Sequence, residues 1–134
     1  MNKLFVRSLA AVAFAVTAFA SHAQVAVVMG PNAAPLTKDQ VANIYLGRNA
    51  DLKPLDLPES SPTRGAFYQK ATDREASQVK AVWARLVFSG KGQPPKELPD
   101  AAAVKKAVAA DPKAIGYIEK SAVDGSVKVV LSLD

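Results

Sequence analysis

The sequence contains no cysteine, and its single histidine, His22, lies close to the N-terminus. A disulfide framework and a Cys–His nucleophilic site are therefore excluded. If residues 1–23 are removed, as argued next, a Ser–His–Asp triad is excluded as well. A zinc site would have only carboxylates as ligands, and the Asp and Glu residues form no close pair in the sequence. We therefore expect no enzyme, no metal site and no cofactor.

The N-terminal segment has the pattern of a secretory signal peptide. Lys3 and Arg7 form a basic region, residues 9–20 are apolar, and positions 21 and 23 carry small residues. We expect cleavage after Ala23. The alternative is an N-terminal membrane anchor, but the apolar run is short for a bilayer span. The chain is expected to be exported, in the simplest case to a bacterial periplasm, with no stable membrane insertion after cleavage.

The remaining residues, 24–134, are enough for one compact domain and too few for two. Lys3 and Arg7 supply two of the five net positive charges of the whole chain. The other charges are interspersed, and Lys105-Lys106 is the only pair of adjacent basic residues. This pattern indicates an ordinary solvated surface and no nucleic-acid partner. A mild positive balance still suits a small anionic ligand.

Hydrophobic periodicity predicts strands that alternate with helices. Apolar runs or alternation predict strands at 25–28, 52–57, 114–118 and 127–133. Four segments have a helical pattern. The first follows residue 37, the second runs from 62 to 71, the third ends before Gly90 and the fourth ends near residue 110. Strands separated by helices need crossover connections, so we predict an α/β fold with a small mixed sheet flanked by helices. The last strand is expected to pair antiparallel with its neighbour through the Asp124-Gly125 turn.

Several local signals set the expected boundaries of these elements. The segments Thr37–Gln40 and Thr72–Glu75 each match a capping box, and Asp100 is a further N-cap candidate. Gly116 is expected to permit close packing against its strand. Residues 90–99 are rich in Gly and Pro and are expected to form a loop.

The segment PESSPTRGAF (58–67) is the best candidate for a binding site. Ser61 fits an N-cap, Pro62 fits the first helical position, and Thr63 and Arg64 follow. The backbone N–H groups of Thr63 and Arg64, the hydroxyls of Ser60, Ser61 and Thr63, and the Arg64 charge could together bind an oxyanion. The plain alternative is that Ser61 only caps its own helix and that Arg64 is solvated.

Four segments resemble, in the same order, motifs of the phosphate-binding proteins of ABC transporters, within the periplasmic binding protein superfamily. They are LTKDQVANIYLGR (36–48), PESSPTRGAFYQKA (58–71), VWARLVFSGKG (82–92) and PKAIGYIEKSAV (112–123). The resemblance implies a fold like one lobe of a type II periplasmic binding protein. It places Ser61 and Thr63 at positions that hydrogen-bond phosphate in the family. Pro62 replaces a usual glycine, and Leu57 stands near the position of an arginine in larger members.

The resemblance leads to two functional hypotheses. The first is a periplasmic oxyanion-binding protein, with phosphate the first candidate, linked to ABC-type uptake or phosphate sensing through Ser60, Ser61, Thr63 and Arg64. The second is a non-enzymatic module that keeps the fold without the ligand and binds an envelope protein, for example through the loop SGKGQPPKELP (89–99). Family members enclose the anion between two lobes, so a permease, another envelope protein or a second copy of the chain are the candidate protein partners.

Overall fold

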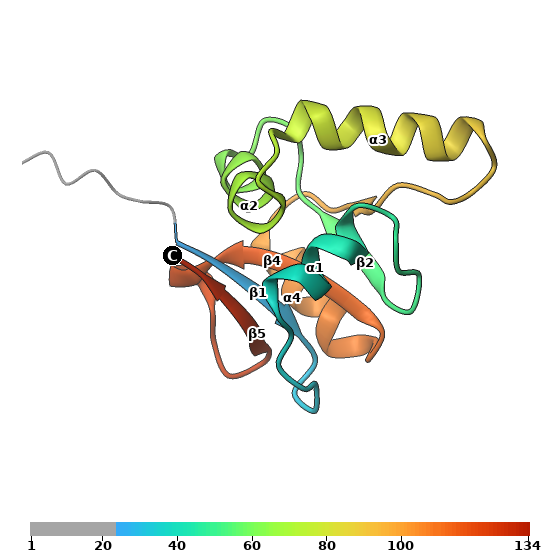
Figure 1. Cartoon of the computed structure of the whole chain (residues 1–134). Helices are drawn as coiled ribbons and strands as arrows, with labels where there is room; N and C mark the ends of the chain where they lie inside the picture. The colour runs from blue at the N-terminus through green and yellow to red at the C-terminus, as the bar shows by residue number, and fades with distance from the viewer. Residues whose placement is uncertain (1–23) are drawn as a thin grey trace, which may run out of the picture.

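A computed structural model describes residues 24–134, and the predicted signal peptide, 1–23, lies outside the described residues. One five-stranded mixed sheet forms the centre, in the order β3-β2-β4-β1-β5 (Figure 1). The strands are β1 (Val25–Met29), β2 (Lys53–Asp56), β3 (Lys96–Glu97), β4 (Ala114–Glu119) and β5 (Lys128–Leu133). The helices are α1 (Lys38–Tyr45), α2 (Pro62–Thr72), α3 (Ala76–Phe88) and α4 (Ala101–Ala110), with a 3₁₀ turn at Lys120–Ala122. The predicted α/β fold is confirmed.

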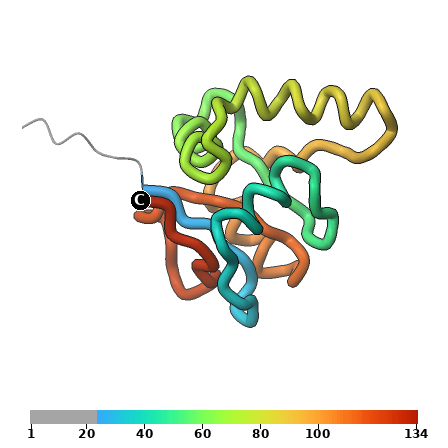
Figure 2. Tube along the Cα trace, in the orientation of Figure 1, coloured from blue at the N-terminus to red at the C-terminus, as the bar shows by residue number. Residues whose placement is uncertain are grey.

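The direction of the strands divides the sheet in two. β2 runs parallel to β3 and to β4, whereas β1 runs antiparallel to β4 and to β5. Val25 lies opposite Leu133, so the two ends of the described chain lie side by side (Figure 2). The strand β3 has two residues and lies inside the segment 90–99, which the sequence predicted as loop.

The predicted hairpin between the last two strands is wrong. β5 pairs with β1, and β1 lies between β5 and β4. All five residues of β1 are buried, so this strand needs cover on both faces and on both edges. A central position provides that cover, whereas a hairpin of β4 and β5 would leave β1 with one free edge.

The N-caps of two helices form as predicted. The Thr37 hydroxyl accepts a hydrogen bond from the N–H of Gln40, whose side chain accepts one from the Thr37 N–H. Asp100 Oδ1 accepts a hydrogen bond from the N–H of Ala103 at 2.8 Å. These bonds satisfy N–H groups that have no partner within their own helix.

The predicted capping box at 72–75 is wrong. Thr72 ends α2, and its hydroxyl donates a hydrogen bond to the Tyr68 carbonyl one turn earlier, at 2.6 Å. Asp73 then adopts φ 57°, which reverses the chain before α3 begins. The N–H of Glu75 pairs instead with the side chain of Gln78 at 3.0 Å. The Thr72 hydroxyl had an acceptor in the preceding turn, which local spacing did not reveal.

Two consecutive residues of β4 contact helices on opposite faces of the sheet. A Cβ atom on Gly116 would lie 2.5 Å from the Val104 side chain of α4, so α4 packs closely on this face. The next residue, Tyr117, packs on the opposite face against Phe67 of α2. The predicted close packing at Gly116 is confirmed, and the site described below lies on the Tyr117 side.

We predict that Gly116→Ala destabilises the protein by about 1–3 kcal/mol, because the added methyl overlaps Val104 in a packed layer. Equilibrium unfolding in urea would measure the loss. Gly125→Ala is the matched control, since no atom lies within 4 Å of its Cβ position. We expect the control to change the free energy of unfolding by less than about 0.5 kcal/mol. Equal effects of the two substitutions would contradict the packing described for α4.

Candidate functional site

The four residues predicted to bind an anion lie where β2 leads into α2, and α2 presents them to different surroundings. Ser61 is the N-cap residue and Pro62 is the first helical residue, as predicted. The Ser61 side chain makes no capping hydrogen bond. Ser60 is exposed. The structure thus leaves the two serine hydroxyls at the helix start available to solvent.

Thr63 points toward the sheet. Its side chain is buried, with 4% exposed, and its hydroxyl donates a hydrogen bond to Glu119 Oε1 at 3.1 Å. Its backbone N–H makes no hydrogen bond within residues 24–134. Thr63 therefore offers one free donor at the positive end of α2, next to a carboxylate of the same chain.

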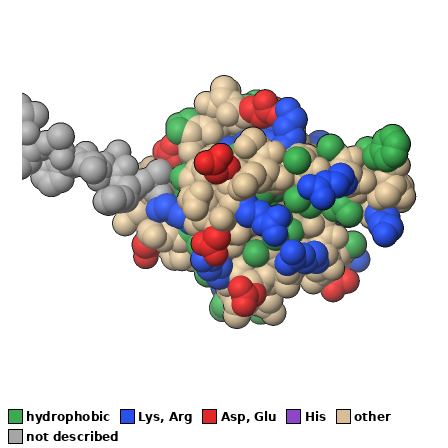
Figure 3. Space-filling model, turned by 45° about the horizontal axis from the view of Figure 1, so that its top comes forward, with side chains coloured by type: hydrophobic (Ala, Val, Ile, Leu, Met, Phe, Trp, Pro, Cys, Tyr) green, Lys and Arg blue, Asp and Glu red, His purple; other side chains and the backbone are tan. Residues whose placement is uncertain are grey.

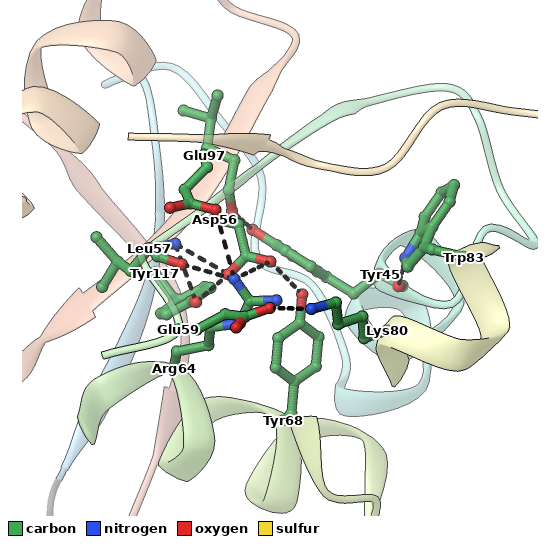
Figure 4. A network of polar contacts seen from close by, with 11 residues as sticks. Tyr45, Asp56, Leu57, Glu59, Arg64, Tyr68, Lys80, Trp83, Glu97 and Tyr117 are labelled. Atoms are coloured by element: carbon green, nitrogen blue, oxygen red, sulfur yellow. Dashed lines mark hydrogen bonds and ion pairs between the residues drawn. The ribbon is translucent and has the colours of Figure 1, made fainter. Parts of the chain in front are cut away.

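Arg64 turns away from Thr63 and back toward the end of β2. Its Nη1 donates to the Leu57 carbonyl at 2.9 Å and lies 3.7 Å from Asp56 and 3.8 Å from Glu97 (Figure 4). The side chain is only 11% exposed. A cation in the first turn of a helix is unfavourable by itself, and here Asp56 offsets the charge from within the chain.

One edge of the Arg64 guanidinium is left without a partner. The buried Nε forms no hydrogen bond. Within residues 24–134, the hydrogen bond and both ion pairs of the guanidinium use Nη1 alone. The Nε–Nη2 edge is the one with which arginine binds a carboxylate or phosphate through two parallel hydrogen bonds. This edge therefore holds an unsatisfied donor, although Nε itself has no surface exposed to solvent.

The buried carboxylate of Asp56 organises this region. It is 4% exposed and accepts hydrogen bonds from the Tyr68 hydroxyl at 2.6 Å, from the Leu57 N–H at 2.9 Å and from the Tyr117 hydroxyl (Figure 4). Three donors and the nearby Arg64 compensate the cost of burying this charge. Asp56 thereby joins β2, β4 and α2.

An aromatic cluster surrounds the Asp56 carboxylate. The rings of Phe67 and Tyr117 stack with centroids 4.0 Å apart, and Tyr45 meets Phe67 edge-on at 4.6 Å. The Tyr45 hydroxyl donates to the Leu55 carbonyl at 2.7 Å. Burial and the charge of Asp56 raise the pKa values of Tyr45, Tyr68 and Tyr117 above their ordinary value of 10.0.

Sequence analysis did not identify Asp56 or the tyrosines around it. Only one signal was available: Arg64 and Tyr68 are four residues apart, so they share a helix face, and the guanidinium lies 5.8 Å from the Tyr68 ring centre. The role of Asp56 depends on Tyr117, which is distant in the sequence and reaches it only through the pairing of β2 with β4.

Two hollows meet at Arg64. The smaller, of about 340 Å³, lies between the starts of α2 and α3 and is lined by Ser61, Arg64, Gly65 and Lys80, with Glu59, Ala76 and Ser77. The larger, of about 550 Å³, continues between α3 and the segment before β3. Ser61 and Arg64 are thus brought together in one hollow, called here the α2 pocket. Ser60 is not among the residues that line it, and Thr63 faces Glu119 instead.

Lys80 and Glu59 form an ion pair across the α2 pocket. Their Nζ and Oε1 atoms are 2.6 Å apart, and both side chains are more than half exposed. The hydrogen bond and the charge of Lys80 lower the pKa of Glu59. Lys80 is therefore a cation next to Arg64 whose partner an incoming anion could replace.

Other kinds of site find no support in the described part of the chain. Within residues 24–134 no group of three or more His, Cys, Asp or Glu side chains could hold a metal ion. Over the same residues no helix is long and apolar enough to cross a membrane.

Comparison with solved structures identifies the fold. An ABC-type phosphate transport receptor from Vibrio cholerae aligns with a TM-score of 0.62 and 23% identity, over 81% of this chain and 47% of the receptor. A putative phosphate ABC transporter substrate-binding protein with bound phosphate from Clostridium perfringens aligns with a TM-score of 0.64 and 23% identity, over 81% of this chain and 45% of that protein. PstS from Borrelia burgdorferi aligns with a TM-score of 0.56 and 13% identity, over 81% of this chain and 47% of PstS.

The fold is that of half a phosphate-binding protein of ABC transporters. The chain spans about half the length of these proteins, as the resemblance in the sequence implied. No protein-family model and no curated protein matches the chain. At these identities the likeness concerns the fold, and binding by this chain has to be argued from its own residues.

We predict that none of the three tyrosines ionises in the native protein up to a pH of about 11, because the folded state raises their pKa values. Ultraviolet absorbance would detect tyrosinate as the pH rises. The tyrosines of the unfolded chain ionise near pH 10. Their contribution to the free energy of unfolding is therefore fully present below that pH and is lost as the pH rises above it. Tyrosinate should therefore appear together with unfolding. The same titration in concentrated urea is the control, and smooth ionisation near pH 10 without unfolding would contradict the buried network.

Proposed function

We propose that the chain binds a small oxyanion, with phosphate the first candidate, at the start of α2 and without catalysis. The observation that carries the proposal is the unsatisfied Nε donor of Arg64, a residue that lines the α2 pocket together with Ser61 and Lys80. A guanidinium, a hydroxyl and an ammonium group supply donors that suit the oxygens of a tetrahedral anion.

The starts of two helices add to these donors. The N–H of Thr63 has no partner in residues 24–134, and the hydroxyls of Ser60 and Ser61 lie at the same helix end. Ala76 and Ser77, the first residues of α3, line the α2 pocket from the other side. Both helix N-termini carry partial positive charge, which favours an anion between them.

The fold supports phosphate as the first ligand to test. The Clostridium perfringens protein that shares this fold was solved with bound phosphate. In our proposal the chain is exported to the periplasm after cleavage behind Ala23, and there it serves ABC-type uptake or phosphate sensing. A permease or a sensor protein would be its partner in that role.

Nearby carboxylates limit the affinity. Glu59 forms an ion pair with Lys80, and Glu119 accepts a hydrogen bond from the Thr63 hydroxyl. An incoming anion has to compete with both carboxylates. Hydrogen bonds to a charged group contribute roughly 1.5–3 kcal/mol each, against an association cost of at least about 4 kcal/mol. Water also has access to an open pocket. We therefore expect binding by a single chain to be roughly millimolar.

We predict that Glu59→Gln strengthens phosphate binding about three- to tenfold, because it removes a competing charge and frees Lys80. Lys80→Gln should weaken binding by a similar factor, and Ser61→Ala should weaken it without affecting the fold, since its hydroxyl makes no capping bond. Isothermal titration calorimetry at constant ionic strength measures all three affinities.

Calorimetry together with a matched control variant makes this experiment decisive. Phosphate and sulfate stabilise most proteins by exclusion from their surface, so a rise in melting temperature alone is not sufficient. Ser132→Ala, on β5, should leave the affinity unchanged. Binding that does not respond to Glu59, Lys80 or Ser61 would place the anion elsewhere, and the absence of binding at tens of millimolar phosphate would refute the proposal.

A specific observation also supports the second hypothesis, a module that binds another protein. Phe88 is 94% exposed and Val87 is 48% exposed, at the end of α3 where the segment 89–99 begins. Exposed apolar side chains that gather in one place often mark a protein-binding surface. Val87 and Phe88 line a hollow that also contains Arg64 and Lys80, so protein binding here would take place next to the anion site.

A further inference from the structure

The end of α3 carries an exposed apolar patch. Three large hydrophobic side chains are exposed within residues 24–134, and two of them, Val87 and Phe88, are neighbours at this end. Figure 3 shows a hydrophobic side chain projecting at the right-hand tip of the molecule, with further hydrophobic side chains nearer the middle, among Lys and Arg side chains. Phe88 is 94% exposed and lies at the rim of a hollow, from which it projects as a single apolar knob.

A groove lies directly beside this knob. It is the hollow of about 550 Å³ introduced above, and its apolar walls are Val79, Trp83 and Val87 of α3 and Pro94-Pro95 of the following segment. Glu59, Lys80 and Glu97 lie among its charged lining residues. We call this hollow the α3 groove. Its volume and apolar walls suit an aromatic side chain.

The walls of the α3 groove are fixed by contacts to the core. Trp83 Nε1 donates to the Tyr45 carbonyl at 2.8 Å, which holds the indole ring in place. The opposite wall continues into Leu98, whose N–H donates to the Asp56 carbonyl at 2.9 Å. The groove is therefore preformed and would not need to open for a ligand.

We propose that a second copy of this chain occupies the α3 groove, with Phe88 of each copy inserted into the groove of the other. A twofold interface uses the same patch on both copies, so the patch must carry both a projecting group and its cavity. Phe88 and the α3 groove meet this requirement within a few residues of one another. A lipid bilayer could bury the exposed Phe88 side chain, but it has no projecting group that would fill the α3 groove.

The charges at the groove are compatible with this self-pairing. Within each chain Lys80 pairs with Glu59 at 2.6 Å and Arg64 lies 3.8 Å from Glu97, so the charges of the groove are largely offset before a second copy approaches. Arg85 and Lys91 line a separate small hollow together with Val82 and Leu86, and they do not line the α3 groove. The patch therefore contains both signs of charge and does not repel itself.

Such an interface would also enclose the anion site. The α3 groove and the α2 pocket share Glu59, Arg64 and Lys80, so a second copy in the groove covers the guanidinium. Exclusion of water strengthens hydrogen bonds to a charged ligand. This consequence rests on the proposed function, whereas the pairing itself does not.

The test is the mass of the protein as a function of concentration. The chain is expressed from its full sequence and purified from the soluble fraction, and mass spectrometry identifies its N-terminus. Light scattering from about 10 µM to 1 mM should show the mass rising toward that of a dimer, as expected for a small and weak interface. Phe88→Asp should keep the protein monomeric over this range, while Val129→Thr, an exposed apolar position on β5, should not.

A second measurement locates the interface. Trp83 is the only tryptophan of the chain and lines the α3 groove, so its fluorescence reports on occupation of the groove. Its emission should shift to shorter wavelength as the dimer forms, and this shift should be absent in Phe88→Asp. Dimers without that shift, or dimers that persist in Phe88→Asp, would overturn the proposal, as would a monomer at all concentrations.

The outcomes for the two sites can be separated. Phosphate titrations of Phe88→Asp measure the anion site in the monomer, and light scattering without phosphate measures pairing alone. If pairing encloses the site, the native chain should bind phosphate more tightly at dimer-forming concentrations than at concentrations where it is monomeric. A monomer that binds an acidic peptide or vesicles of anionic lipid through Phe88 would assign the knob to a different partner and refute self-association.

Discussion

The burial of the Asp56 carboxylate is the interaction on which the rest of the structure depends. A charge at the end of β2 can be buried only if donors surround it. Tyr117 brings a hydroxyl from β4, Tyr68 brings one from α2, and Arg64 supplies an opposite charge. These contacts tie the start of α2 to the sheet and so determine which side chains it presents. The same contacts bury most of the Arg64 side chain and leave its Nε without a partner.

This arrangement explains how the α2 start differs from a plain helix cap. In a plain cap the serine hydroxyl would bond to its own helix and the arginine would be solvated. Here Ser61 makes no such bond, and Arg64 is largely buried against Asp56. The groups that remain available lie between α2 and α3, beside the exposed end of α3. The proposed anion site and the proposed protein-binding groove therefore lie side by side and share Arg64 and Lys80.

Much of the fold could be predicted because its signals are local. The helix starts at Thr37 and Asp100 depend on residues three positions away, and the apolar pattern of β1 depends on neighbours in the chain. The hairpin between the last strands and the cap at Thr72 were wrong for the opposite reason. Each was decided by a competing partner, β1 in the first case and the Tyr68 carbonyl in the second, whose position no local spacing encodes.

The sequence by itself determined the alternation of strands and helices, the absence of cysteine and of histidine beyond His22, and the position of Ser61, Thr63 and Arg64 at one helix start. Only the tertiary structure decided where these side chains point. Thr63 turns to Glu119 and Arg64 turns to Asp56, because carboxylates from β4 and β2 reach the helix end once the sheet has formed. Charge attraction acts through space and not along the chain, so the sequence could mark the donors without revealing their partners.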